Sequence, residues 1–178
     1  INLLMGRNST IPNEIETILD LTEKGGASMV FHSMDEADVE NIMKYPNTMI
    51  ASDSGIREFG EGVPHPRGYG SNARVLSKYV RDRKVLKLED AVKRMTSLPA
   101  QRFGFKNRGL LREGMAADIV IFDPLTVTDQ STYEKPHQYS TGFQYVIVNG
   151  KITVNNNIHT GVRNGKILYG PGYKSTNN

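Results

Sequence analysis

The chain has 178 residues, 38% of them hydrophobic and 23% charged, with a formal net charge of +3. It has no cysteine, which excludes disulfides and thiolate chemistry within this sequence, and no apolar run approaches the roughly 18 to 20 residues that cross a bilayer. The longest basic cluster, 78–87, mixes its charges with apolar residues at helical spacing, so we interpret it as a solvated helix face and expect neither a nucleic-acid nor a membrane partner.

The first part of the chain predicts two helices separated by a buried strand. Apolar residues recur at helical spacing over 14–24, with Pro12 just before them and a glycine pair just after. The short run 27–31 predicts a strand, 35–44 predicts a helix with an acidic first turn, and 48–52 predicts a second strand. Strand, helix and strand in such a short stretch are typical of a βαβ unit with parallel strands.

The rest of the chain predicts two more helices, over 73–83 and 88–97, and then a change to β structure. Short β-type runs separated by Gly, Asn and Pro follow, and these are 118–122, Phe143–Val148, 151–154 and 166–169. Asn149-Gly150 predicts a tight hairpin, because both residues tolerate the positive φ of a type I′ turn, and 155–157 predicts another. We therefore expect an α/β part, 1–104, and a small antiparallel β module, 105–178.

The residues most able to carry chemistry lie at the ends of the two predicted strands. The apolar run 49–51 leads to Asp53, where Ser54 breaks the pattern. In a parallel α/β enzyme the strand ends display catalytic groups, so Asp53 could be a general base or a ligand of a divalent metal. The alternative is an aspartate that opens a turn. Phe31 and Met34, at the end of the other strand, could line an apolar substrate pocket or belong to the core.

Arg67 lies on the long loop that follows Asp53, directly after Pro64-His65-Pro66. A guanidinium can hold a carboxylate with two parallel hydrogen bonds, and loops longer than about 12 to 15 residues are usually functional or disordered. Arg67 is therefore a candidate clamp for an acidic substrate. The alternative is a surface ion pair with Glu58 or Glu61.

The four histidines do not form a recognisable metal motif. His32 and His65 could be metal ligands, but neither has a histidine at i+2 or i+4, and an isolated histidine is more often structural. His137 and His159 lie far along the chain in the β module, and we interpret them as structural or surface residues.

Several segments carry a resemblance to a known family. The sequence GLLREGMAADIVIFDP, at 109–124, is typical of many amidohydrolases. The serine-aspartate pair that ends at Asp53, the HPR sequence that ends at Arg67, and MTSLPA at 95–100 are more specific. With 31–39 and 146–150, they resemble D-aminoacylases, which are zinc-dependent N-acyl-D-amino-acid deacylases of the amidohydrolase superfamily. The resemblance covers about residues 10 to 170 and implies the C-terminal portion of such an enzyme.

This resemblance implies a fold. The chain would form the last part of a (β/α)8 TIM barrel, with 27–31 and 48–52 as strands seven and eight, followed by a small β-sandwich over 105–178. One or two zinc ions are implied, held mostly by residues absent from this chain, since no H-x-H pair occurs in it. The implied partner is the missing N-terminal half of the barrel.

The resemblance also implies roles for the candidate residues. Asp53 corresponds to the aspartate that takes a proton from the attacking water and can touch the metal. Arg67 corresponds to the arginine that holds the substrate carboxylate. The full set of expected substrate-binding residues is Arg67, His65, Ser54, Phe31 and Met34.

The expected reaction is hydrolysis of an N-acyl-D-amino acid to a carboxylate and a free D-amino acid. The loop 55–59 departs from the family's more usual Gly-Leu-Pro, which leaves the substrate open. One alternative is another amide or cyclic-amide hydrolase, similar to dihydroorotase or hydantoinase, and a second is a non-catalytic assembly domain. We expect the isolated chain to be inactive. The sequence leaves open whether the protein forms a homo-oligomer, and we expect it in the cytoplasm rather than in the periplasm.

Overall fold

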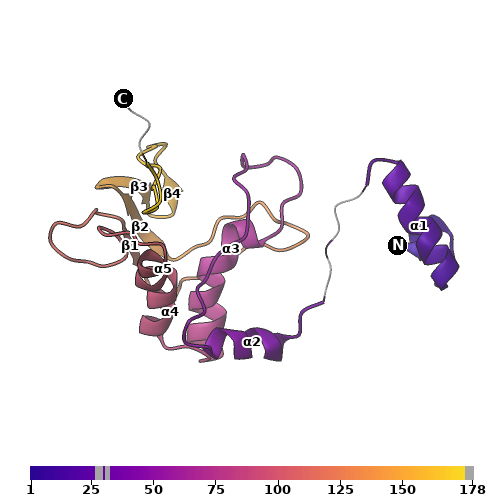
Figure 1. Ribbon diagram of the computed structural model, residues 1–178, viewed down its shortest axis with the longest axis horizontal. Coiled ribbons are helices and arrows are strands. Elements are labelled where there is room, and N and C mark those ends of the chain that lie inside the picture. The colour runs from indigo at the N-terminus through magenta and orange to yellow at the C-terminus, as the bar shows by residue number, and fades with distance from the viewer. Residues whose placement is uncertain (27–29, 31–32, 175–178) are drawn as a thin grey trace. The chain divides into compact units, whose positions relative to one another are not determined.

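The computed structural model describes residues 1–26, 30 and 33–174, and it divides into two compact units, Ile1–Asp35 and Glu36–Asn178 (Figure 1). The predicted strand 27–31 falls mostly outside the described residues, as do Phe31 and His32. Among the described residues, no helix combines the length and the apolar character needed to cross a membrane.

The first unit contains the short 3-10 helix η1 (Asn2–Met5) and the helix α1 (Ile11–Glu23). Thr10 caps α1, because its Oγ1 accepts the N–H of Asn13 at 3.4 Å. Pro12 lies in the first turn of α1. Backbone N–H groups in the first turn have no acceptor within the helix, so the N–H that proline lacks costs no helical hydrogen bond. The predicted helix over 14–24 is therefore confirmed, with its start one turn earlier.

The second unit has its helices in four places along the chain. These are α2 (Glu36–Lys44), α3 (Arg67–Arg74) continuing into the π-helical η2 (Val75–Asp82), α4 (Leu88–Met95) and α5 (Ser97–Arg102). The three predicted helices are confirmed, but the one over 73–83 begins earlier, at Arg67. The one over 88–97 ends at Met95, and Pro99 then lies in the first turn of α5, where proline is tolerated.

The sheet is antiparallel, with the strands in chain order. They are β1 (Ile119–Phe122), β2 (Phe143–Val148), β3 (Lys151–Asn155) and β4 (Ile158–His159). Asn149 and Gly150 connect β2 to β3 with φ of 46° and 79°, and Asn156 and Asn157 connect β3 to β4 with φ of 47° and 63°. These values place all four residues in the left-handed region that a type I′ turn needs, so both predicted hairpins are confirmed.

Two predicted strands are not formed. The segment 48–52 makes no strand pairing; Ile50 instead donates its N–H to the carbonyl of Arg94 at 3.2 Å. A strand exists only beside another strand, and the sheet within the described residues consists of β1 to β4. The βαβ unit is thus not seen here. The segment 166–169 also forms no strand, and Ile167 in it is exposed.

The core of the second unit joins its helices to its sheet. One cluster, on η2, α4 and the connection between them, contains Val75, Tyr79, Leu86 and Ala91, with Ile50 packed against it. A second consists of Ala73, Leu76 and Val127, with Phe122 and Phe143 of the sheet packed against it. The architecture is therefore a mixture of helices and an antiparallel sheet that share buried contacts, and the domain boundary near residue 104 stays a prediction.

Candidate functional site

The segment that leads to Asp53 is held by α4. Arg94 is 6% exposed, and its Nη1 donates to the carbonyls of Tyr45 at 2.6 Å and Thr48 at 2.9 Å. Together with the bond from Ile50 to the carbonyl of Arg94, these contacts fix the chain just before Asp53. The backbone of Asp53 has a φ of 48°, in the left-handed region that aspartate and asparagine enter more easily than other side chains. Its carboxylate is 85% exposed.

Arg67 is the first residue of α3, and its side chain meets Asp53. The Nη2 atom of Arg67 lies 3.0 Å from Oδ2 of Asp53, and the Arg67 side chain is 45% exposed. The structure thus gives Arg67 an ion pair with Asp53 in place of the surface pairs with Glu58 or Glu61. A carboxylate and a guanidinium that are fourteen residues apart in the sequence become neighbours.

His65 lies beside this pair and is engaged at both ring nitrogens. Its Nδ1 accepts the backbone N–H of Arg67 at 3.0 Å, and its Nε2 lies 3.2 Å from the hydroxyl of Tyr133. Because Nδ1 accepts, the neutral ring carries its proton on Nε2 and donates it to Tyr133. Burial first, and then the positive charge of Arg67, lower the pKa of His65. In this conformation His65 orients the start of α3 and has no nitrogen left for a metal.

Ser54 packs closely against α3. A side chain at position 68 would place its Cβ 2.6 Å from the Oγ of Ser54, so the glycine at 68 is what allows this approach. The Ser54 hydroxyl donates to the carbonyl of Gly55 at 3.3 Å. Met34 is 69% exposed and belongs to the first unit. The structure therefore brings together Asp53, Ser54, His65 and Arg67 from the predicted set.

Sequence reasoning missed the residues that hold the loop between Asp53 and Arg67. His137, interpreted as structural or surface, contacts this loop through Gly60 and Gly62, and Tyr133 contacts it through His65. The available signal was the grouping of aromatic and histidine residues within 133–139. Composition does not reveal which distant loop such a group contacts.

The described residues do not form a metal site by themselves. No group of three or more His, Cys, Asp or Glu side chains that could hold a metal ion occurs among them. Asp53 is the candidate ligand, and its neighbour is the cation of Arg67. What the arrangement offers is a carboxylate that can accept a proton next to a guanidinium that can bind an anion.

Comparison with known proteins finds similarity over the part of the chain that contains this pair. Residues 47–154 match the amidohydrolase family. Over 142 residues the chain is 42% identical to D-aminoacylase from Alcaligenes xylosoxydans xylosoxydans, which covers 80% of this chain and 29% of that protein.

Solved structures are similar over the same part. A D-aminoacylase crystal structure has a TM-score of 0.70 and 41% identity, covering 76% of this chain and 28% of that chain. The N-acyl-D-glutamate deacylase of Bordetella bronchiseptica was solved with zinc and a phosphonate inhibitor that mimics the tetrahedral intermediate. It has a TM-score of 0.63 and 46% identity, covering 67% of this chain and 25% of that chain. The chain thus spans less than a third of the length of these relatives.

Proposed function

The chain belongs to the amidohydrolase family, and on that premise we propose that it is the C-terminal part of a zinc-dependent N-acyl-D-amino-acid deacylase. The observation that carries the proposal is the contact at 3.0 Å between Asp53 and Arg67, both within the family match. In this proposal 48–52 is the eighth strand of a (β/α)8 barrel, whose neighbouring strands lie outside the described residues. The sheet β1–β4 belongs to a β-sandwich.

Arg67 binds the carboxylate of the substrate. Its guanidinium sits at the first turn of α3, half exposed, with His65 fixing the backbone N–H of the same residue. In the structure this cation is paired with Asp53, but exposed pairs contribute only about 0–1 kcal/mol, so a substrate carboxylate can replace Asp53. Binding at Arg67 orients the scissile amide bond, and this positional effect is the contribution of the residue to the reaction.

Asp53 moves the proton. Released from Arg67, its carboxylate accepts a proton from the attacking water and delivers it to the nitrogen of the leaving amine. Zinc, when bound, supplies acidification of water and polarisation of the amide carbonyl. Because the described residues offer Asp53 without a further ligand group, the other zinc ligands are expected outside them.

The test uses the protein in its full natural length. Purified protein is incubated with N-acetyl-D-leucine, N-acetyl-D-aspartate, N-acetyl-D-glutamate and the matching L-isomers, and free amino acid is measured; its zinc content is measured in parallel. The expected result is release of a D-amino acid and stoichiometric zinc. Hydrolysis of dihydroorotate or hydantoin instead would favour a cyclic-amide hydrolase. Absence of any turnover in zinc-loaded protein would refute the proposal and favour an assembly domain.

Arg67→Ala serves as the internal comparison in this assay. Loss of one charged hydrogen-bonding partner costs about 1.5–3 kcal/mol, which corresponds to a rise in KM of roughly 10- to 150-fold for the N-acyl amino acid. The carboxamide of the same substrate has no carboxylate, so its KM is expected to stay within threefold of the wild-type value. An equal loss on both substrates would contradict the role of Arg67.

A further inference from the structure

The loop 54–66 connects Asp53 to Arg67, yet it has little structure of its own. Its side chains Ile56 and Val63 are exposed, and it forms a turn in which Glu61 donates its N–H to the carbonyl of Glu58 at 3.2 Å. A loop with few internal contacts takes its conformation from whatever it packs against. The relevant contacts come from the segment 129–140, which is distant in sequence and lies beside α3 (Figure 1).

His137 bridges two backbone groups of this loop. Its Nδ1 accepts the N–H of Gly60 at 3.1 Å, and its Nε2 lies 2.9 Å from the carbonyl of Gly62. A backbone N–H can only donate and a carbonyl can only accept, so the ring is the neutral tautomer with its proton on Nε2. The hydroxyl of Tyr69, on α3, lies 3.0 Å from the same Nδ1. One imidazole therefore joins the loop to the helix that begins with Arg67.

Aromatic contacts reinforce this bridge. Phe59 of the loop stacks on Tyr139, with ring centroids 4.8 Å apart and an interplanar angle of 29°. Phe59 also meets the edges of His137 at 5.6 Å and Tyr69 at 6.0 Å. Offset-stacked and edge-to-face pairs of this kind stabilise a contact beyond the area that they bury. The Oγ of Ser140 donates to the carbonyl of Tyr69 at 2.9 Å, which fixes α3 to the same segment.

The segment 129–140 is itself well anchored. The hydroxyl of Ser131, which is 7% exposed, donates to the carbonyl of Pro136 at 2.6 Å. Asp129 forms an ion pair with Arg74 at 3.0 Å, and a Cβ at Gly70 would lie 2.9 Å from the Cβ of Asp129. The segment thus closes on itself and lies directly on α3, so it can transmit a fixed position to the loop.

We propose that His137 is a positioning residue for the substrate carboxylate. It does not touch the Asp53–Arg67 pair; it holds the loop 54–66 against α3, so that Arg67 stays at the spacing from Asp53 that the bound substrate requires. This inference rests on the proposed deacylase function and extends it to a residue of the β module. A loosened loop would leave Arg67 present but displaced, whereas α4 still holds the segment before Asp53, so the expected effect is weaker binding of the carboxylate.

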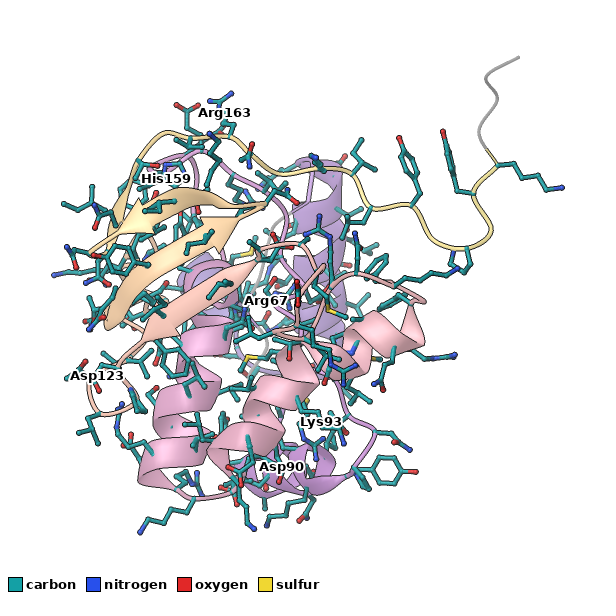
Figure 2. All side chains as sticks on the ribbon, turned by 90° about the vertical axis from the view of Figure 1, so that its left-hand side faces the viewer. Arg67, Asp90, Lys93, Asp123, His159 and Arg163 are labelled. Atoms are coloured by element: carbon teal, nitrogen blue, oxygen red, sulfur yellow. The ribbon has the colours of Figure 1, made fainter. Side chains whose placement is uncertain are left out.

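The test compares three variants in the full-length protein. His137→Ala removes the bridge, His137→Phe keeps the ring contacts but cannot form the two hydrogen bonds, and His159→Ala is the matched control. Figure 2 shows His159 at the edge of the sheet, where its Nδ1 accepts the N–H of Gly161. Both His137 variants are expected to raise KM for the N-acyl amino acid about 10- to 100-fold, with kcat within threefold and little change for the carboxamide. His159→Ala is expected to match the wild type.

Two further readouts separate positioning from general destabilisation. The double variant His137→Ala, Arg67→Ala is expected to be no worse than Arg67→Ala, because His137 acts through Arg67. Additive losses, or equal losses on acid and carboxamide, would overturn the proposal. Cleavage by a glutamate-specific protease after Glu58 and Glu61 is expected to be at least about tenfold faster in His137→Ala than in His159→Ala.

The protease experiment needs no enzymatic activity. Unchanged cleavage in His137→Ala would show that the ring does not hold the loop and would overturn the inference even if the deacylase function stands. If the wild-type protein lacks deacylase activity, the proposed function fails and the positioning role fails with it, while the cleavage rates still report whether the bridge exists. His137→Asn retains an acceptor near the position of Nδ1, so its cleavage rate is expected to fall between those of wild type and His137→Ala.

Discussion

Replacing Asp53 by asparagine should separate catalysis from folding, because the position of Asp53 combines an exposed carboxylate with an unusual backbone conformation. Asn is nearly isosteric with Asp but cannot accept a proton at neutral pH. Loss of a general base typically lowers kcat by about 10²- to 10⁴-fold. We expect a loss of at least that size for Asp53→Asn in the full-length protein, measured as release of D-amino acid from its N-acetyl derivative.

The cost in stability can be worked out from the same position. The ion pair with Arg67 is exposed, with 85% of the Asp53 side chain accessible, so its removal should cost no more than about 0–1 kcal/mol. The backbone φ of 48° is one that asparagine tolerates, whereas alanine pays about 1–2 kcal/mol there. We therefore expect Asp53→Asn to melt near the wild type, and Asp53→Ala to melt lower because its free energy of unfolding falls by a further ~1–2 kcal/mol.

Comparing Asp53→Asn with Asp53→Ala tests the catalytic role of Asp53 and the backbone argument separately. Thermal unfolding followed by circular dichroism gives the stabilities, and the amino-acid release assay gives the activities. Turnover close to wild type in Asp53→Asn would refute the assignment of Asp53 as the base. Equal melting temperatures for Asp53→Asn and Asp53→Ala would refute the argument from the left-handed backbone.

Three further predictions concern the framework of the site. Gly142→Ala should lower the free energy of unfolding by about 1–3 kcal/mol more than Gly150→Ala in urea denaturation. Both glycines have positive φ, 86° and 79°, but a Cβ at 142 would lie 2.4 Å from the Cα of buried Val127. Equal costs would contradict this. Arg94→Met should cost about 2–5 kcal/mol by the same assay, because two main-chain carbonyls lose their donor, and an unchanged midpoint would argue against that role. The pKa of His65 is lowered from 6.5 by burial and by the neighbouring guanidinium, so the unfolded chain binds more protons at acid pH. The free energy of unfolding should therefore fall as pH drops below about 6.5, level off below the folded pKa, and lose this component in His65→Gln.

Local chemistry explains which elements could be predicted. Asn149-Gly150 specifies its turn through backbone conformations that few other residues enter, and this turn sets the adjacent pairing of Val148 with Lys151. The shift in register between Val146 and Ile147 carries no such local signal. Helices with clear apolar spacing, such as α1 and α2, were likewise predicted within a few residues of their ends. In each case the signal lies within the element itself.

Elements that depend on distant partners could not be predicted in the same way. The run 48–52 has the composition of a strand, but its conformation depends on what lies beside it, and here the carbonyl of Arg94 takes the N–H of Ile50. Asp53 and Arg67 were each predicted as candidate site residues, but their contact at 3.0 Å was not predicted, because no local pattern fixes it. The contacts of His137 with the loop were not predicted, because that loop lies more than seventy residues earlier.

The close approach of Ser54 to Gly68 has a consequence for how this site can vary among related sequences. The φ of Gly68 is not in the positive range, so its backbone accepts other residues, and the limit is steric. Alanine at 68 would force the Ser54 hydroxyl, at 2.6 Å, to rotate away, while the Ser54 Cβ, at 3.4 Å, could remain. A β-branched residue at 54 could not turn both of its branches aside. Positions 54 and 68 are therefore expected to covary, with the larger side chain permitted at only one of them.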